Sequence, residues 1–315
     1  MKRIISFAAA LTLIFGAASC QKNDPATKEG DVQVVFDFEI PQEAATKATM
    51  GDGSTVDVLF YEIYVGDQVM YDDKVYRTEN GNFTLTVKLV KGMTYDLLFW
   101  AQKEGTGYYN TDKLQKVIVN YAGLANDESR DAFYGSYPNF KAGSNPETIY
   151  LYRPFAQVNF GASPEDWKSA SPFVVDDEDK VKVKSSMTIA GVPNAFNVKT
   201  GDVVNGEVAN VEFSLNAAPI AEGKYTNNYI THNQKDYAWV AMNYILAPED
   251  GANVNVSAGF VHMKNESNPL VKEVPQVPVK QNHRTNILGD VFTEGNTFQI
   301  VIVPGFTDEI IEELK

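Results

Sequence analysis

Apolar and polar residues alternate with a period of two through much of this 315-residue chain, and this pattern limits the fold more than any other feature. Residues 83–89 show it most regularly, which is typical of a half-buried β-strand. Residues 95–101 are almost continuously apolar and indicate a strand that is covered on both faces. The same reasoning predicts strands at residues 34–40, 57–65, 116–121, 157–160, 181–189, 211–215, 237–246, 254–263 and 297–303.

Helices are expected only in two short segments, residues 125–133 and 308–314. Turn-forming sequences, such as the Lys91-Gly92 pair and residues 248–251, separate the predicted strands. Many short strands joined by such turns are typical of β-sandwiches and barrels. The sequence therefore predicts an all-β fold.

The length of the chain predicts two domains, at about 150 residues for each domain. Hydrophobic residues make up 44% of the chain, which is enough for a core in each half. A loop rich in Gly, Ser, Asn and Pro lies before a new series of strands, and Arg153 before Pro154 favours an extended backbone there. We therefore expect an N-terminal domain at residues 31–152, a C-terminal domain at residues 153–305 and a short acidic tail at residues 306–315.

Residues 1–19 have the features of a signal peptide. Two basic residues are followed by an apolar segment, residues 4–15, that is too short to span a bilayer as a helix. Small residues precede Cys20, the only cysteine of the chain, and this arrangement resembles the lipobox of bacterial lipoproteins, in which the cysteine is acylated. The alternative is an ordinary signal peptide followed by a cysteine by chance. Residues 20–30 are polar, and we expect them to form a flexible tether.

Side chains that usually carry catalysis or bind metals are scarce. The three histidines, His232, His262 and His283, lie in separate segments without the spacing of metal ligands. Acidic residues 176–179 lack the spacing of a calcium loop and indicate a solvated turn. A formal net charge of −14 argues against nucleic acid as a partner. We therefore predict no enzymatic activity, no catalytic residue, no metal and no cofactor.

Tryptophans are candidate platforms for sugar rings. Trp100 and Trp239 lie in strongly apolar segments, which predicts positions in a core. Trp167 lies in a charged segment, which predicts an exposed position on a loop. A single exposed tryptophan gives weak support for glycan binding.

Four motifs together resemble the fimbrillins of the Bacteroidia, and the similarity, which extends over nearly the whole mature chain, is greatest to a fimbrillin-like branch of unassigned function. They are Thr-Lys-Ala at residues 46–48, Asp-Leu-Leu-Phe-Trp-Ala at 96–101, Leu-Tyr-Arg-Pro-Phe-Ala-Gln-Val at 151–158 and His-Arg-Thr-Asn-Ile-Leu-Gly at 283–289. The resemblance implies two transthyretin-like β-sandwich domains in tandem. It also implies a lipoprotein precursor that is exposed at the surface of the outer membrane and assembles into fimbriae.

In stalk-forming fimbrillins, a trypsin-like protease cuts after a basic residue beyond the first strand, and Lys47 matches this position. The resemblance makes the first strand, with Val34, Phe36, Phe38 and Ile40, the candidate segment for strand exchange between subunits. The expected function is that of a structural or adhesive fimbrial component, as subunit, tip or anchor. Its expected partners are the outer membrane, other fimbrial subunits or a surface ligand. The alternative is a surface glycan-binding lipoprotein that does not polymerise.

Overall fold

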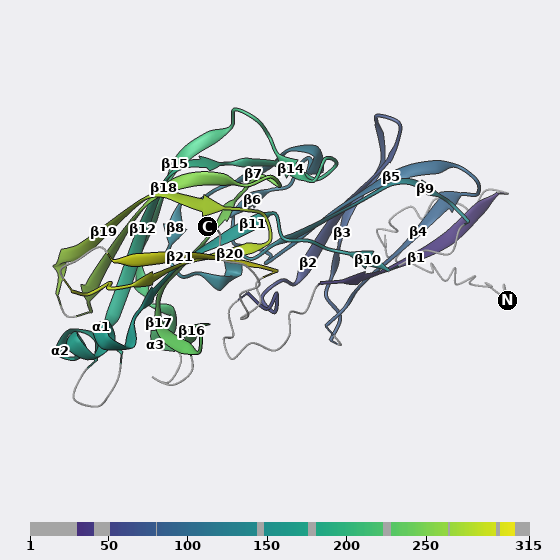
Figure 1. Ribbon diagram of the computed structural model, residues 1–315. Helices are drawn as coiled ribbons and strands as arrows, with labels where there is room; N and C mark the ends of the chain where they lie inside the picture. Colours follow the sequence, from purple (N-terminus) through teal and green to yellow (C-terminus); the bar gives the residue numbers. More distant parts are fainter. Residues whose placement is uncertain are drawn as a thin grey trace, which may run out of the picture.

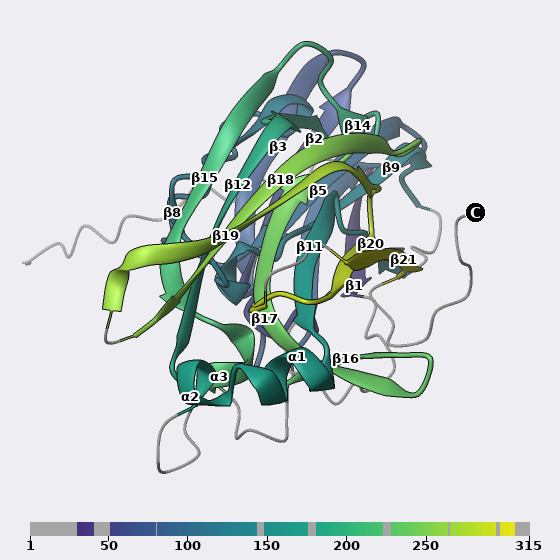
Figure 2. The same cartoon turned by 60° about the vertical axis from the view of Figure 1, so that its left-hand side comes forward.

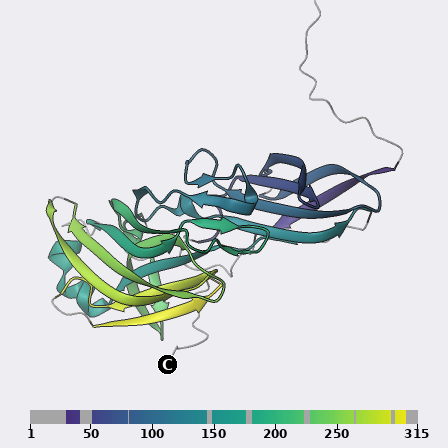
Figure 3. The same cartoon turned by 90° about the horizontal axis from the view of Figure 1, so that it is seen from above.

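The computed structural model describes residues 30–40, 51–79, 81–143, 148–175, 181–222, 228–263, 265–293 and 297–305. Nearly all of the regular structure is β-strand, arranged in five sheets, so the predicted all-β sandwich class is confirmed. A smaller and a larger part follow one another along the length of the molecule (Figures 1 and 3).

The smaller part is a sandwich of two sheets that pack face to face. The first sheet has the strand order β10 (Ile149–Tyr150), β1 (Asp31–Glu39), β4 (Phe83–Val90). The second has the order β3 (Gln68–Tyr76), β2 (Val58–Val65), β5 (Thr94–Gln102), β9 (Phe133–Lys141). Side chains between these sheets form the smaller core, whose phenylalanines are Phe36, Phe38, Phe83, Phe99, Phe133 and Phe140.

The larger part contains two five-stranded sheets. One has the order β19 (Asn265–Val279), β18 (Ala252–His262), β12 (Val183–Pro193), β15 (Val208–Ala217), β8 (Gly123–Leu124). The other has the order β16 (Tyr229–His232), β17 (Lys235–Leu246), β11 (Phe155–Ala162), β20 (His283–Gly289), β21 (Phe298–Pro304). All residues of β11 are buried, because this strand pairs on both sides and is covered on both faces. The larger core lies mainly around it.

A fifth sheet packs against β5 of the smaller part. Its order is β14 (Asp202–Val203), β13 (Ala195–Asn197), β7 (Val117–Val119), β6 (Tyr109–Asn110). On β5, Phe99 belongs to the smaller core, whereas the next residue, Trp100, belongs to the larger core. The ring of Trp100 lies 5.4 Å from that of Tyr109 and 6.1 Å from that of Phe196. The sheet that contains β5 therefore contributes side chains to both cores.

The division into domains at residues 152 and 153 stays a prediction. Strands β6, β7 and β8 come before this point in the sequence, but side chains of residues 109–125 belong to the larger core. The backbone pairs across the predicted boundary as well, since β8 pairs with β15 and β7 pairs with β13. Along the sequence, the two cores thus overlap.

Three short helices lie together at one end of the larger part (Figure 2). They are α1 (Pro164–Ser169), α2 (Ser171–Val174) and α3 (Pro219–Glu222). Two 3₁₀ turns, η1 (Leu114–Lys116) and η2 (Glu128–Arg130), interrupt the strands elsewhere. Among the described residues, no helix is long and apolar enough to cross a membrane.

Every segment predicted as a strand overlaps a strand of the structure. The helix expected at residues 125–133 is wrong, because only the turn η2 forms there. The backbone N–H groups of Ala125 and Asn126 donate to Ser214 and Met242 of neighbouring strands, and not to a helical turn. The second predicted helix, at residues 308–314, lies outside the described residues.

Sequence patterns missed several strands, among them the long strand β19. This strand contains Pro269, Pro275 and Pro278, which weaken a strand pattern because proline donates no backbone hydrogen bond. The structure shows β19 at the edge of its sheet, where a missing donor is tolerated and where proline hinders pairing with other chains.

Candidate functional site

Strand β1 lies between β10 and β4 in a sheet of the smaller sandwich, at the end of the molecule that lies away from the three helices (Figure 1). We call the place that β1 occupies between these two strands the groove. Its alternating side chains Val34, Phe36 and Phe38 are buried in the smaller core, and Ile40 is partly buried against the same core. The ring of Phe36 lies 5.1 Å from that of Phe140. Burial of three such side chains contributes about 5–9 kcal/mol, before the entropy of ordering the strand is counted.

Backbone pairing holds β1 differently on its two sides. Its pairing with β4 is antiparallel and runs from Asp31 to Phe38. On the other side, β1 pairs in parallel with the two-residue strand β10, at Phe38 and Glu39 only. The carbonyl group of Glu39 also accepts a hydrogen bond from the N–H of Leu151, at 2.9 Å. One edge of β1 is therefore fully paired among the described residues, and the other is paired near its end.

A cleft of about 580 Å³ lies at the end of the groove, where β1 leaves the sheet. It is lined by the end of β1, by Phe83 at the start of β4 and by the exposed Tyr150 of β10. Arg77 also lines it, and the guanidinium group of Arg77 donates to the carbonyl groups of Gly53 and Val56, at 3.1 and 3.0 Å.

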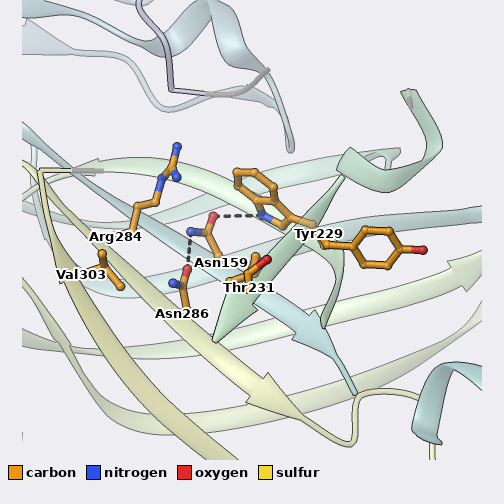
Figure 4. A pocket seen from close by; sticks show the side chains of 8 residues that line it. Asn159, Tyr229, Thr231, Arg284, Asn286 and Val303 are labelled. Carbon is orange, nitrogen blue, oxygen red and sulfur yellow. Dashed lines mark hydrogen bonds between the residues drawn. The ribbon is translucent and has the colours of Figure 1, made fainter. Parts of the chain in front are cut away.

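A second site, on β11, β17 and β20, is built from buried polar side chains (Figure 4). The amide of Asn159 donates to Asn286 at 2.8 Å, and its carbonyl oxygen accepts from the indole N–H of Trp239 at 3.2 Å. The guanidinium group of Arg284 lies 5.5 Å from the ring centre of Trp239. The cavity they surround measures about 10 Å³, which is room for one water molecule and not for a sugar ring.

The tryptophans do not offer a platform for sugars. Trp100 and Trp239 are buried, as predicted. The prediction that Trp167 is exposed on a loop is wrong: it lies in helix α1, is 5% exposed and packs against Phe292 at 5.9 Å between ring centres. The hydroxyl of Ser163 accepts from the N–H of Asp166 and caps this helix, so the sequence Ser-Pro-Glu-Asp at residues 163–166 carries a helix-start signal that we missed.

The histidines lie on three different strands, with His232 on β16, His262 at the end of β18 and His283 at the start of β20. Burial lowers the pKa of His283, and its ring nitrogen Nδ1 lies 2.5 Å from the carbonyl oxygen of Gln281. In the part of the chain that the structure describes, no three His, Cys, Asp or Glu side chains gather as metal ligands would. Cys20, Lys47 and the acidic residues 176–179 lie outside the described residues.

Comparison with solved structures gives matches over most of the chain. A "putative cell adhesion protein" from Bacteroides uniformis has a TM-score of 0.51 at 12% identity, over 88% of this chain and 98% of that one. A fimbrial assembly protein from Parabacteroides distasonis has a TM-score of 0.45 at 12% identity, over 86% and 95% of the two chains. A fimbrilin from Porphyromonas gingivalis has a TM-score of 0.44 at 11% identity, over 81% and 90%.

The first of these matches shows a shared fold, so the resemblance predicted from the sequence motifs is found again among solved structures. Comparison with curated proteins gives no match. The sequence profile of a family described as a family of unknown function (DUF6562) matches residues 25–315, and the chain therefore belongs to this family.

Proposed function

We propose that the protein is a structural or adhesive component of surface fimbriae. The observation that carries this proposal is the position of β1, a strand near the start of the chain that fills a groove of the smaller core between β4 and β10. The fold shared with a protein named for cell adhesion supports it. Other fimbrial subunits or a surface ligand are the proposed partners.

Anchoring is proposed to depend on Cys20, with residues 1–19 removed as a signal peptide and the cysteine acylated, for example with palmitate. Two or more acyl chains hold a protein stably on a membrane, whereas one chain holds it only weakly. The Cys20→Ala variant is expected to carry no lipid and to leave the outer-membrane fraction of cells. Retention of the variant in that fraction, with no lipid on the parent protein, would contradict this part of the proposal.

Assembly is proposed to proceed by strand exchange after a cut at Lys47. Release of β1 would leave the edge of β4 unpaired and uncover Phe99 and Phe140, which line the groove. An unpaired edge above an apolar floor is a site at which an extended strand adds to a sheet. Because β1 buries three large side chains, we expect it to remain bound after the cut until a strand of another subunit replaces it. No catalytic role is proposed.

Digestion of the soluble protein that starts at Gln21 with a lysine-specific protease tests the assembly step. We expect a cut at Lys47 before cuts in the folded parts, followed by multimers when further subunits are added. The Lys47→Gln variant is the matched control and is expected to stay uncut at this point and monomeric. Protection of Lys47, or cut protein that accepts no strand and forms no multimers, would overturn strand exchange and favour an anchor, a tip or a lipoprotein that does not polymerise.

A further inference from the structure

A buried ion pair lies where the smaller and the larger core meet. The side chains of Arg153 and Asp131 are 1% and 0% exposed. The Nε and Nη2 groups of Arg153 donate to the two carboxylate oxygens of Asp131, at 2.8 and 3.0 Å. The guanidinium group lies 4.6 Å from the ring centre of Phe133. This bidentate geometry fixes the guanidinium plane, which a lysine ammonium group would not do.

The same ion pair holds the backbone of Gly51. The Nη2 group of Arg153 donates a short hydrogen bond to the carbonyl oxygen of Gly51. The N–H of Gly51 donates to the carboxylate of Glu128 at 2.5 Å, and the hydroxyl of Tyr244 donates to that carboxylate at 3.1 Å. Both backbone polar groups of Gly51 are thus bound by polar side chains that lie 77 and 102 residues away in the sequence.

The residues that follow Gly51 are fixed as well. The hydroxyl of Thr55 donates to the carbonyl oxygen of Glu128 at 3.2 Å, and Arg77 binds the carbonyl groups of Gly53 and Val56. The side chain of Val56 is fully buried in the smaller core. Residues 51–56 are therefore attached firmly, although they begin only eleven positions after Ile40.

Strand β1 and residues 51–56 are held by different kinds of contact. Apolar burial and a backbone ladder hold β1, and both can be reproduced by another strand of suitable sequence. Hydrogen bonds to the side chains of Glu128 and Arg153 hold Gly51, and a replacement strand in the groove does not compete for them. We infer that Arg153, Asp131 and Glu128 form a retaining clamp, which keeps the chain from Gly51 onward in place when the strand before it is released. This inference rests on the proposed function.

The clamp sets the boundary between the segment that is released, which contains β1, and the chain that is retained, which begins at Gly51. Without it, the chain before Gly53, which Arg77 binds, would become a loose end beside the empty groove after a cut. That loose end would compete with an incoming strand for the edge of β4. Retention at Gly51 keeps the groove vacant.

Hydrogen exchange of the cut protein tests the clamp. To make the test independent of Lys47, a recognition sequence for a specific protease replaces residues 42–48, and exchange is followed by mass spectrometry before and after the cut. We expect residues 31–39 to exchange at least ten times faster after the cut when competing strand peptide is present. Exchange of residues 51–56 should change less than twofold.

The Arg153→Lys and Asp131→Asn variants remove the bidentate contact. In cut protein, either variant is expected to raise the exchange of residues 51–56 at least tenfold, while Glu104→Gln, at an exposed site, leaves it unchanged. Arg153→Lys keeps the charge and serves where Asp131→Asn does not fold. Fast exchange of residues 51–56 in the cut parent protein, or slow exchange in a folded variant, would overturn the clamp. Failure to form multimers would overturn the proposed strand exchange instead, because exchange of residues 51–56 does not depend on assembly.

Discussion

The smaller and the larger core differ in how they depend on the start of the chain. The smaller core draws Val34, Phe36 and Phe38 from β1, which lies before the predicted cut at Lys47. Among the described residues, no hydrophobic side chain from before Phe60 belongs to the larger core or packs against it. Loss of residues before Gly51 would thus open the smaller core and leave the larger core with all of its members. We therefore expect the proposed strand exchange to be confined to the smaller part of the molecule and to leave the larger core intact.

The two cores are nevertheless joined through a shared sheet. On β5, Leu97 and Phe99 face the smaller core, while Leu98 and Trp100 face the larger one. All three tryptophans belong to the larger core, so tryptophan fluorescence reports directly on that core only. Three substitutions test whether the two cores depend on each other for stability.

Truncation of Phe36 has the largest expected effect. Phe36→Ala removes a fully buried ring from the smaller core and should lower the free energy of unfolding by about 3–5 kcal/mol. Because β5 serves both cores, we expect urea transitions followed by far-UV circular dichroism and by tryptophan fluorescence to shift together. Val35→Ala, on the exposed face of the same strand, is the control and should change stability by less than about 0.5 kcal/mol. A shift in the dichroism alone would mean that the cores unfold separately.

Gly53→Ala tests the contact between the retained segment and the end of β1. Gly53 has a φ of +69°, and an added Cβ would lie 3.0 Å from both Ile40 Cγ2 and Phe133 Cζ. We expect a loss of about 2–4 kcal/mol, from backbone strain plus overpacking. Gly66→Ala has a similar φ of +60° and no atom within 4 Å of the added Cβ, so it should lose only about 1–2 kcal/mol, from strain alone. Equal losses in denaturant unfolding would show that Ile40 does not pack firmly there.

Glu128 should make stability depend on pH at the junction of the two cores. Burial of the carboxylate, and next the charge of Asp131, raise the pKa of Glu128 to about 8, although Gly51, Tyr244 and Arg153 act in the opposite direction. A raised pKa means that the folded protein favours the protonated acid. The stability from this group is therefore full below pH 4.5 and is lost as the pH rises through 8.

The expected loss is up to about 1.4 kcal/mol for each pH unit, which amounts to about 2 kcal/mol between pH 6.5 and 8. This window lies above the lowered pKa of His283. Denaturant unfolding of Glu128→Gln should show no such slope and greater stability at pH 8, whereas Glu104→Gln should keep the slope of the parent. A slope that persists in Glu128→Gln would assign the titration to another group.

Local patterns predicted much of the fold because a strand shows its period of two in its own sequence. The inward direction of Val34, Phe36 and Phe38 follows from that period alone. The same approach failed at β19, where prolines break the pattern, and at Trp167, where charged neighbours hide a buried ring. Both residues that form the ion pair were also missed, although Arg153 stands out as a lone charge in the apolar segment 151–156.

The sequence by itself determined that the chain forms strands, which side chains of β1 face inward and that the motifs resemble those of fimbrillins, because each depends on residues close together in the chain. Only the tertiary structure decided which strands share a core and that Arg153 reaches both Asp131 and Gly51, 22 and 102 residues away. The packing of sheets sets such long-range contacts, and one charged residue has many partners that its sequence alone does not distinguish. The strand that fills the groove can thus be predicted from the sequence, whereas the clamp beside it forms only in the folded chain.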